Sequence, residues 1–158
     1  MKKLFVIALA IITCLSLAAC GGKSSDQSGT QPATADVVEA VASQLTFKDE
    51  LMTLEDKMVA NIYNLDEEKL AEKTVRTSAT RATAEEVSVF KVKDAADVGM
   101  VQDAINERIE DQKIAYENYV PAEMAKINNA AVYTNGSYVI LVMADDTSKV
   151  EELFQAQF

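Results

Sequence analysis

The chain has 158 residues, carries a formal net charge of −10 at pH 7 and contains no histidine. The absence of histidine excludes Ser-His and Cys-His nucleophile pairs and histidine-ligated zinc. The negative charge argues against nucleic acid as a partner, because anionic phosphates repel an acidic protein.

The first 19 residues differ in character from the rest. Lys2 and Lys3 precede an uncharged and almost wholly apolar run at residues 4–19. A positive start followed by a short apolar run is typical of a secretory signal peptide, and this run is shorter than the roughly 20 residues that a membrane span needs. We therefore expect residues 1–19 to be a signal peptide.

The apolar run ends in Leu17-Ala18-Ala19-Cys20. This motif resembles the lipobox of bacterial lipoproteins. The resemblance implies a diacylglyceryl group on the sulfur of Cys20, cleavage between Ala19 and Cys20, and a lipid anchor on the extracytoplasmic face of the cell membrane. Two acyl chains anchor a protein stably, whereas one binds marginally. The alternative is an uncleaved N-terminal helix in which Cys20 is an ordinary thiol.

Cleavage before Cys20 simplifies the rest of the chain. It removes Cys14, so that no free thiol, disulfide or cysteine-based metal site is expected, and it lowers the side-chain charge to −12 through the loss of Lys2 and Lys3. Residues 20–34 are rich in Gly, Ser, Thr and Gln, which predicts a flexible tether. Residues 35–158 are enough for one hydrophobic core, so we expect a single domain.

The start of the domain predicts one helix and then an ambiguous segment. Thr34 or Asp36 is expected to cap a helix that runs to about Leu45, with apolar residues at every third or fourth position. Residues 51–65 mix apolar side chains at helix-like spacing and predict a short helix or turns. A polar helical turn is expected near residues 67–72.

Two strands and the longest helix follow. Alternating β-branched residues at 74–80 predict an outer strand, and residues 86–93 predict a firmer one. Asp94 is expected to cap a long helix whose apolar positions recur every three or four residues. Pro121 ends this helix and suits the first turn of a short one through residues 122–127.

The clearest local signal is Asn135-Gly136, which lies between apolar runs at 130–134 and 137–144. Asn-Gly favours the type I′ turn of a β-hairpin. Such a turn gives Tyr133 and Tyr138 the parity of a cross-strand pair. The second arm is apolar on both faces, so we expect a central strand covered by helix on at least one face.

Asp146 or Thr147 is expected to cap a terminal helix that runs to about Ala156. The predicted order is therefore α-(α)-β-β-α-α-β-β-α. Hairpin-linked strand pairs separated by a long helix favour an α+β fold, with an antiparallel sheet of about four strands and helices packed on one face.

Residues that carry chemistry are few. Paired acids occur at three places, namely Glu85-Glu86, Asp94 with Asp97, and Asp145-Asp146. Such runs are typical of solvated faces and helix starts, although Asp145 and Asp146 are also candidates for a weak divalent site. A serine–lysine pair is the remaining route to a nucleophile, and no pattern sets a particular lysine beside a particular serine. We therefore expect no enzyme, no metal and no cofactor.

Four tyrosines form a candidate recognition patch. Tyr116 and Tyr119 lie near the end of the long helix, and Tyr133 and Tyr138 flank the hairpin turn. Buried rings with wet hydroxyls are the ordinary use of tyrosine, and the alternative is an aromatic patch that the helix end and the hairpin form together. Arg108 is the cation of the long helix that could be buried, and a structural ion pair is favoured over a ligand contact.

Several segments carry a further resemblance, namely residues 61–66, 84–94, 108–112, 116–121 and 136–145. With them, the chain from about Asp36 to its C-terminus resembles an uncharacterised family of clostridial-type lipoproteins, the domain of unknown function numbered 4358. The resemblance implies an envelope location of the Gram-positive type and supplies no activity.

The sequence thus predicts a membrane-anchored lipoprotein with a non-enzymatic adaptor domain for a cell-surface protein partner. One alternative is a binder of a small ligand or cell-wall fragment, and another is a hydrolase that uses carboxylates alone. A flat apolar patch would favour the adaptor and an aromatic-lined concavity the binder. A water-filled cleft with two facing, partly buried carboxylates would favour the hydrolase.

Overall fold

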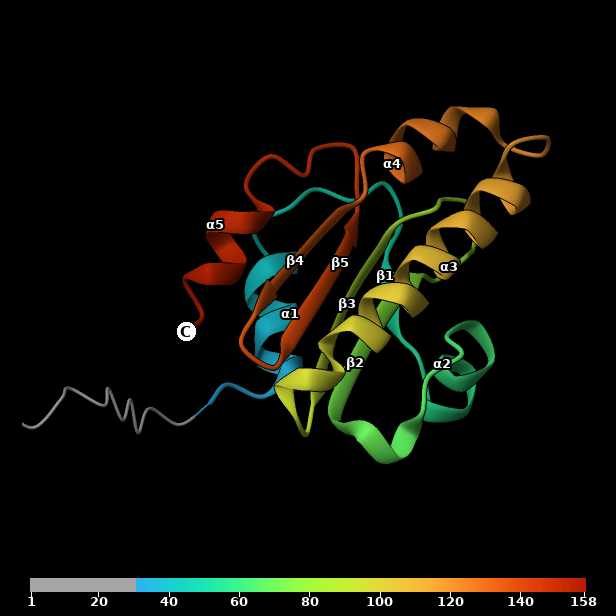
Figure 1. Ribbon diagram of the computed structural model, residues 1–158. Coiled ribbons are helices and arrows are strands. Elements are labelled where there is room, and N and C mark those ends of the chain that lie inside the picture. The colour runs from blue at the N-terminus through green and yellow to red at the C-terminus, as the bar shows by residue number, and fades with distance from the viewer. Residues whose placement is uncertain (1–30) are drawn as a thin grey trace, which may run out of the picture.

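The computed structural model describes residues 31–158. The expected signal peptide, Cys20 and the tether up to residue 30 lie outside this range. The expected α+β class is confirmed, since a five-stranded antiparallel sheet packs against helices (Figure 1). In chain order the elements are α1 (Thr34–Ala42), β1 (Leu51–Thr53), α2 (Asp56–Ile62), β2 (Leu70–Ser78), β3 (Glu86–Val92), α3 (Val98–Tyr116), α4 (Met124–Asn128), β4 (Ala131–Asn135), β5 (Tyr138–Met143) and α5 (Val150–Gln155).

The sheet has one strand more than expected. Its order is β1-β2-β3-β5-β4, and all neighbours are antiparallel. The additional strand, β1, falls in the segment at 51–65 that the sequence left ambiguous, and it pairs outside β2, so that β2 is not an outer strand. Three residues are too few to show a strand periodicity in the sequence.

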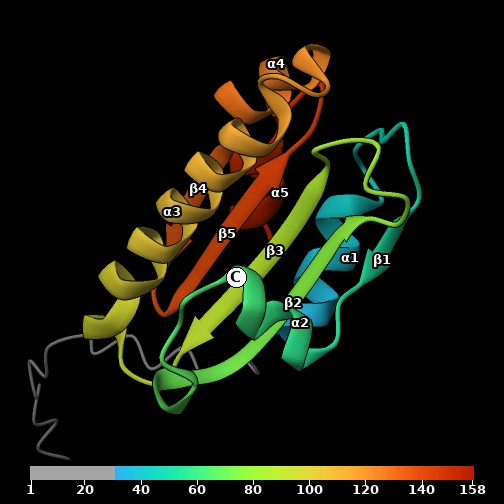
Figure 2. The same ribbon diagram turned by 90° about the vertical axis from the view of Figure 1, so that its right-hand side faces the viewer.

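Helices cover both faces of the sheet, whereas the sequence predicted one covered face. The helices α2, α3 and α4 pack on one face, and α1 and α5 pack on the other. Figure 2 shows the sheet between α3 and α1. The reason lies in β3 and β5, whose side chains are buried on both faces; two apolar faces need two helical layers. Below, these are called the α3 face and the α1 face.

The predicted caps are only partly realised. Neither Thr34 nor Asp36 caps α1; instead, the backbone N–H of Thr34 donates to the carboxylate of Glu72 (3.1 Å). Asp94 does cap, accepting from the N–H of Ala96 (2.9 Å), but it begins a 3₁₀ turn that leads into α3. Pro121 begins a second 3₁₀ turn that leads into α4. Because Thr34 is the first residue of α1, ordered structure begins within the range expected for the tether.

The hairpin forms, but its turn differs by one residue from the expected one. Asn135 pairs with Tyr138, so the central residues are Gly136 and Ser137, and of these only Gly136 has a positive φ (54°). Glycine at the first central position is the signature of a type II′ turn. Tyr133 consequently pairs with Ile140 rather than with Tyr138. Both registers match the same faces of the two arms, so the hydrophobic pattern does not distinguish them.

The two glycines of the described domain make a matched pair for substitution. A Cβ at Gly99 or at Gly136 would meet no atom within 4 Å, but Gly136 has the positive φ. Gly99→Ala should therefore raise the free energy of unfolding by about 0.5 kcal/mol, through better helix propensity. Gly136→Ala should lower it by about 1 kcal/mol, because an L-residue is strained there. Urea unfolding measures both, and equal effects of the two substitutions would contradict the turn assignment.

Candidate functional site

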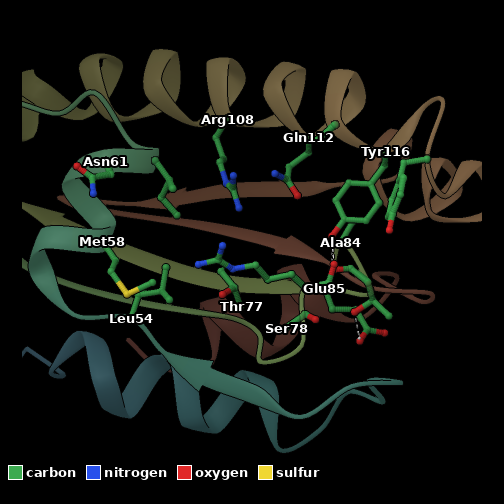
Figure 3. Close-up of a pocket in the computed structure, with 15 residues that line it drawn as sticks. Leu54, Met58, Asn61, Thr77, Ser78, Ala84, Glu85, Arg108, Gln112 and Tyr116 are labelled. Carbon is green, nitrogen blue, oxygen red and sulfur yellow. Dashed lines mark hydrogen bonds between the residues drawn. The ribbon is translucent and has the colours of Figure 1, made fainter.

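A cavity of about 420 Å³ lies on the α3 face. This volume is within the range of small-molecule sites. Its walls come from α2, the end of β2, the loop at residues 79–84 and the C-terminal half of α3 (Figure 3). Leu54, Met58 and Ile62 make one side apolar, and the amides of Asn61 and Gln112 add polar groups.

The loop at 79–84 is tied down at both ends. One carboxylate oxygen of Asp49 accepts from the hydroxyls of Ser78 and Thr80 (2.5 Å each) and from the N–H of Thr80 (3.0 Å). These hydrogen bonds, from Ser78 first and then Thr80, lower the pKa of Asp49 to about 2. From α3, the Tyr116 hydroxyl donates to the carbonyls of Arg81 (3.1 Å) and Thr83 (2.7 Å). The loop is therefore a fixed wall of the cavity.

Arg81 is the unusual residue of this loop. Its φ of 60° is positive, and no other non-glycine residue of the described range has a positive φ. Strained backbone of this kind is concentrated at binding and active sites. Arg76 pairs with Glu39 (2.8 Å) and Arg108 with Glu86 (2.9 Å), whereas Arg81 makes no ion pair with a described carboxylate. Its cation lines the cavity.

Arg108 lines the cavity as well, and it is anchored by a buried carboxylate. Its Nε and Nη2 donate to one oxygen of Glu86 (3.1 and 2.9 Å). The other oxygen accepts from the hydroxyl of Ser88 (2.6 Å) and from that of Tyr63. Burial lowers the pKa of Arg108, but the charge of Glu86, the neighbouring Tyr63 and the hydrogen bonds to both together raise this pKa by more. The predicted structural ion pair of Arg108 is confirmed.

Glu85 is also buried, but it points to a different set of donors. One oxygen accepts from the N–H of Lys48 (2.8 Å) and pairs with Lys126 (3.0 Å). The other accepts from the N–H of Asp49 and the hydroxyl of Thr83 (2.9 Å each). Burial raises the pKa of Glu85, but these hydrogen bonds lower it by more. The stabilisation is present at neutral pH and is lost as the pH falls from the ordinary value of 4.5 through the lowered folded pKa.

The adjacent acids Glu85 and Glu86 therefore do not face one another. Each of their four oxygens accepts from two donors, and each residue has its own cation. A general base needs an oxygen that is free to take a proton from substrate. Glu123 pairs with the same Lys126 (2.8 Å) and accepts from the N–H of Ala84 (3.0 Å). These contacts attach the end of the loop at 79–84 to the segment that begins α4.

The other paired acids have structural partners. Asp97 pairs with Lys69 (2.7 Å), and Asp145 pairs with Lys48 (3.1 Å). Asp146 accepts from the N–H of Ser148 (2.9 Å), and the hydrogen bonds from Ser148 lower its pKa. Within residues 31–158, no group of three or more acidic side chains is arranged to hold a metal ion.

The four tyrosines do not form one patch. Tyr116 and Tyr119 both line the cavity, and Tyr119 is 86% exposed. Tyr133 and Tyr138 belong to the α1 face, where Tyr138 is buried and donates to the carbonyl of Pro32 (2.7 Å). The sheet separates the two pairs, because α3 lies on one face and the side chains of Tyr133 and Tyr138 lie on the other.

Two features were missed from the sequence, and only the second belongs to the site. The first is the Ser-x-x-Lys spacing of Ser88 and Lys91. Side chains three residues apart along a strand point to opposite faces, so Ser88 donates to Glu86 while Lys91 lies over the ring of Tyr138 (5.1 Å). Arg81 was missed because nothing in a loop of Thr and Ala residues reveals a positive φ or a neighbouring cavity. The sequence itself carries no signal for Arg81, since Glu85 and Glu86 follow closely enough to be taken as its partners.

The fold and cavity define a small α+β domain with a preformed pocket above a buried ion pair. The family model described as Domain of unknown function (DUF4358) matches residues 43–144, and the chain belongs to this family. The match spans β1 to β5 and every residue that lines the cavity. No curated protein and no solved structure matches the chain. None of the helices in the described range combines the length and apolar character that a membrane crossing requires.

The ion pair below the cavity can be tested by substitution. Arg108→Met should lower the free energy of unfolding by about 3 kcal/mol, because it leaves the buried carboxylate of Glu86 without a cation. The double variant with Glu86→Gln should regain more than half of the loss, since no charge is then buried.

Lys113→Met is the matched control on the same helix. It breaks an exposed pair with Glu110, and it should cost less than about 0.5 kcal/mol. If denaturant unfolding shows equal costs for Arg108→Met and Lys113→Met, the pair with Glu86 is not the support of the site.

Proposed function

We propose that the chain is a lipid-anchored extracytoplasmic protein whose domain binds a small ligand in the cavity on the α3 face. The observation that carries the proposal is a concave, mostly preformed site with an apolar side and a few converging polar groups. This combination is typical of small-molecule sites. Tyr116 and Tyr119 on its rim make it the aromatic-lined concavity that favours a binder over an adaptor.

An adaptor for a protein partner receives less support. Specific protein interfaces need a contiguous surface of several hundred Å². The large hydrophobic side chains exposed in the described range come from three segments, namely Met52 in β1, Ile114 and Tyr119 near the end of α3, and Phe158 after α5. The surface of the domain therefore offers a cavity for a small ligand rather than a flat apolar patch for a protein partner.

Binding is also a better match than catalysis. The buried carboxylates Glu85 and Glu86 have every oxygen occupied by two donors, and each is paired with a cation. Such groups hold structure in place rather than exchange protons with a substrate. The chain has no histidine to take over that role. The proposed function is therefore non-enzymatic.

The anchor belongs to the same proposal. It is supported by the motif Leu17-Ala18-Ala19-Cys20 behind a charged start and an apolar run, and by the Gly- and Ser-rich residues that follow. Two acyl chains on Cys20 would hold the protein at the membrane without any further membrane-binding surface.

Ligand binding should appear as thermal stabilisation. In a panel of cell-wall fragments, amino acids, sugars and divalent cations, a ligand at 100 times its dissociation constant adds about 2.7 kcal/mol. This raises the midpoint of thermal unfolding by several degrees in a domain of this size. The shift should saturate with ligand concentration.

Two tryptophan variants make the thermal test specific for the cavity. Ala115→Trp places a ring in the cavity and should abolish the shift, whereas Ile114→Trp adds the same ring to α3 outside the lining and should preserve it. The proposed function is rejected if no compound shifts the wild type, or if Ala115→Trp responds as the wild type does.

The anchor has its own test. In cells that express the full chain, Cys20→Ala should move the protein from the membrane fraction to the soluble fraction, because the acylated sulfur is lost. Cys14→Ala, in the apolar run, is the control and should leave the protein in the membrane fraction. Tight membrane binding of the Cys20→Ala variant would contradict the lipobox interpretation.

A further inference from the structure

The charges around the cavity define the chemical class of its ligand, and this inference rests on the proposed function. We infer that the cavity binds an acylated apolar amino acid with a free carboxylate, as at the carboxyl end of a short peptide. Arg81 and Arg108 hold the carboxylate, and the apolar side chain lies against Leu54, Met58 and Ile62.

Three charged side chains line the cavity, namely Arg81, Arg108 and Glu85. Glu85 shares Lys126 with Glu123, and Arg108 is paired with Glu86. Arg81 is the cation of the lining that no described carboxylate engages. An anion is the ligand that such a cation attracts.

Both arginines have hydrogen-bond donors left for a ligand. Arg108 uses Nε and Nη2 on Glu86, so Nη1 remains to donate, and Arg108 points from α3 into the cavity (Figure 3). Arg81 brings a whole guanidinium that no described carboxylate engages. A guanidinium matches the planar fork of a carboxylate and binds it through two parallel hydrogen bonds. The amide of Gln112 is available for a peptide group beside it.

The cavity suits an acylated amino acid better than a free one. The ammonium of a free amino acid would lie beside two arginines. It would need a carboxylate as its partner, but all four oxygens of Glu85 and Glu86 already accept two donors each. An amide in the same place carries no charge. The cavity therefore favours a ligand whose α-nitrogen is acylated.

The size and the backbone agree with this ligand. The volume of about 420 Å³ equals that of about 14 water molecules, which suits one or two amino-acid residues. The positive φ of Arg81 is held by Tyr116 and Asp49 through their bonds to the loop. These contacts maintain the strained backbone conformation at Arg81, which fixes the course of the loop. The guanidinium of Arg81 is thereby preorganised and loses less conformational entropy when a ligand binds.

Calorimetry on the full chain tests the inference with four compounds. N-acetyl-leucine should bind at least about tenfold more tightly than N-acetyl-leucinamide, which lacks the carboxylate, and than leucine, whose nitrogen is charged. The affinity for N-acetyl-leucine should fall as salt is raised, because Arg81 is exposed. The tripeptide Ala-Ala-Leu distinguishes a peptide end, which should then bind more tightly than the acetylated residue, from a single acylated amino acid.

Arg81→Gln is the decisive variant. Because the side chain of Arg81 is exposed, the substitution should leave the fold intact. It should weaken the binding of N-acetyl-leucine by about tenfold or more and leave the amide unaffected. Arg76→Gln is the matched control, since Arg76 lies on the α1 face and pairs with Glu39. It should leave both affinities unchanged.

The outcomes separate this inference from the proposed function. Equal binding of acid and amide, or unchanged binding by Arg81→Gln, overturns the carboxylate assignment and leaves the cavity as a ligand site. Failure of all four compounds to bind also overturns the carboxylate assignment. The proposed function then stands only if a chemically different compound of the thermal panel raises the unfolding midpoint of the wild type but not that of Ala115→Trp. If that panel also gives no shift, both are overturned.

Discussion

Two adjacent carboxylates at the start of β3 must be buried without being left unpaired. A buried charge with no partner costs several kcal/mol, so its surroundings must supply cations and hydrogen bonds. Glu86 turns to the α3 face and takes Arg108, which fixes α3 over the sheet. Glu85 takes Lys126 of α4 and the backbone just before β1. These two residues thus join α3, α4 and the segment before β1 to the central strand of the sheet.

The cavity follows from this arrangement. Arg108 and Tyr116 hold the C-terminal half of α3 against the sheet and the loop at 79–84. On the other side, α2 has seven residues and faces only part of the nineteen-residue α3 (Figure 3). Below the space between them lies the buried ion pair of Arg108 and Glu86. The guanidinium of Arg81 is left without a described carboxylate partner. The hydrogen bonds and ion pairs that make the buried network rigid therefore also hold the walls of the cavity apart.

The parts of this fold that were predictable from the sequence are those with a local cause. Strand β3, helix α3 and the break at Pro121 follow from periodicity and from proline geometry. The three-residue β1 has no periodicity to detect, and the turn at Gly136 is ambiguous because two registers match the same faces. In the site, Arg108 was recognised as a buried pair and Tyr116 as a candidate. Arg81 depends on a loop conformation that distant groups, Asp49 and Tyr116, impose, and no local pattern encodes it.

The hydrogen bond from the Tyr138 hydroxyl to the Pro32 carbonyl fixes the place where the chain enters the domain. Tyr138 pairs with Lys91 near the end of β3, whereas the cavity adjoins its beginning at Ala84 and Glu85. The chain therefore enters the domain about 20 Å along the strands from the pocket and on the opposite side of the sheet. A pull on the N-terminal end is borne by α1 and the hairpin. In the proposed anchored protein, the tether would therefore join the domain at the end remote from the pocket, so that the lipid anchor would not obstruct the pocket mouth.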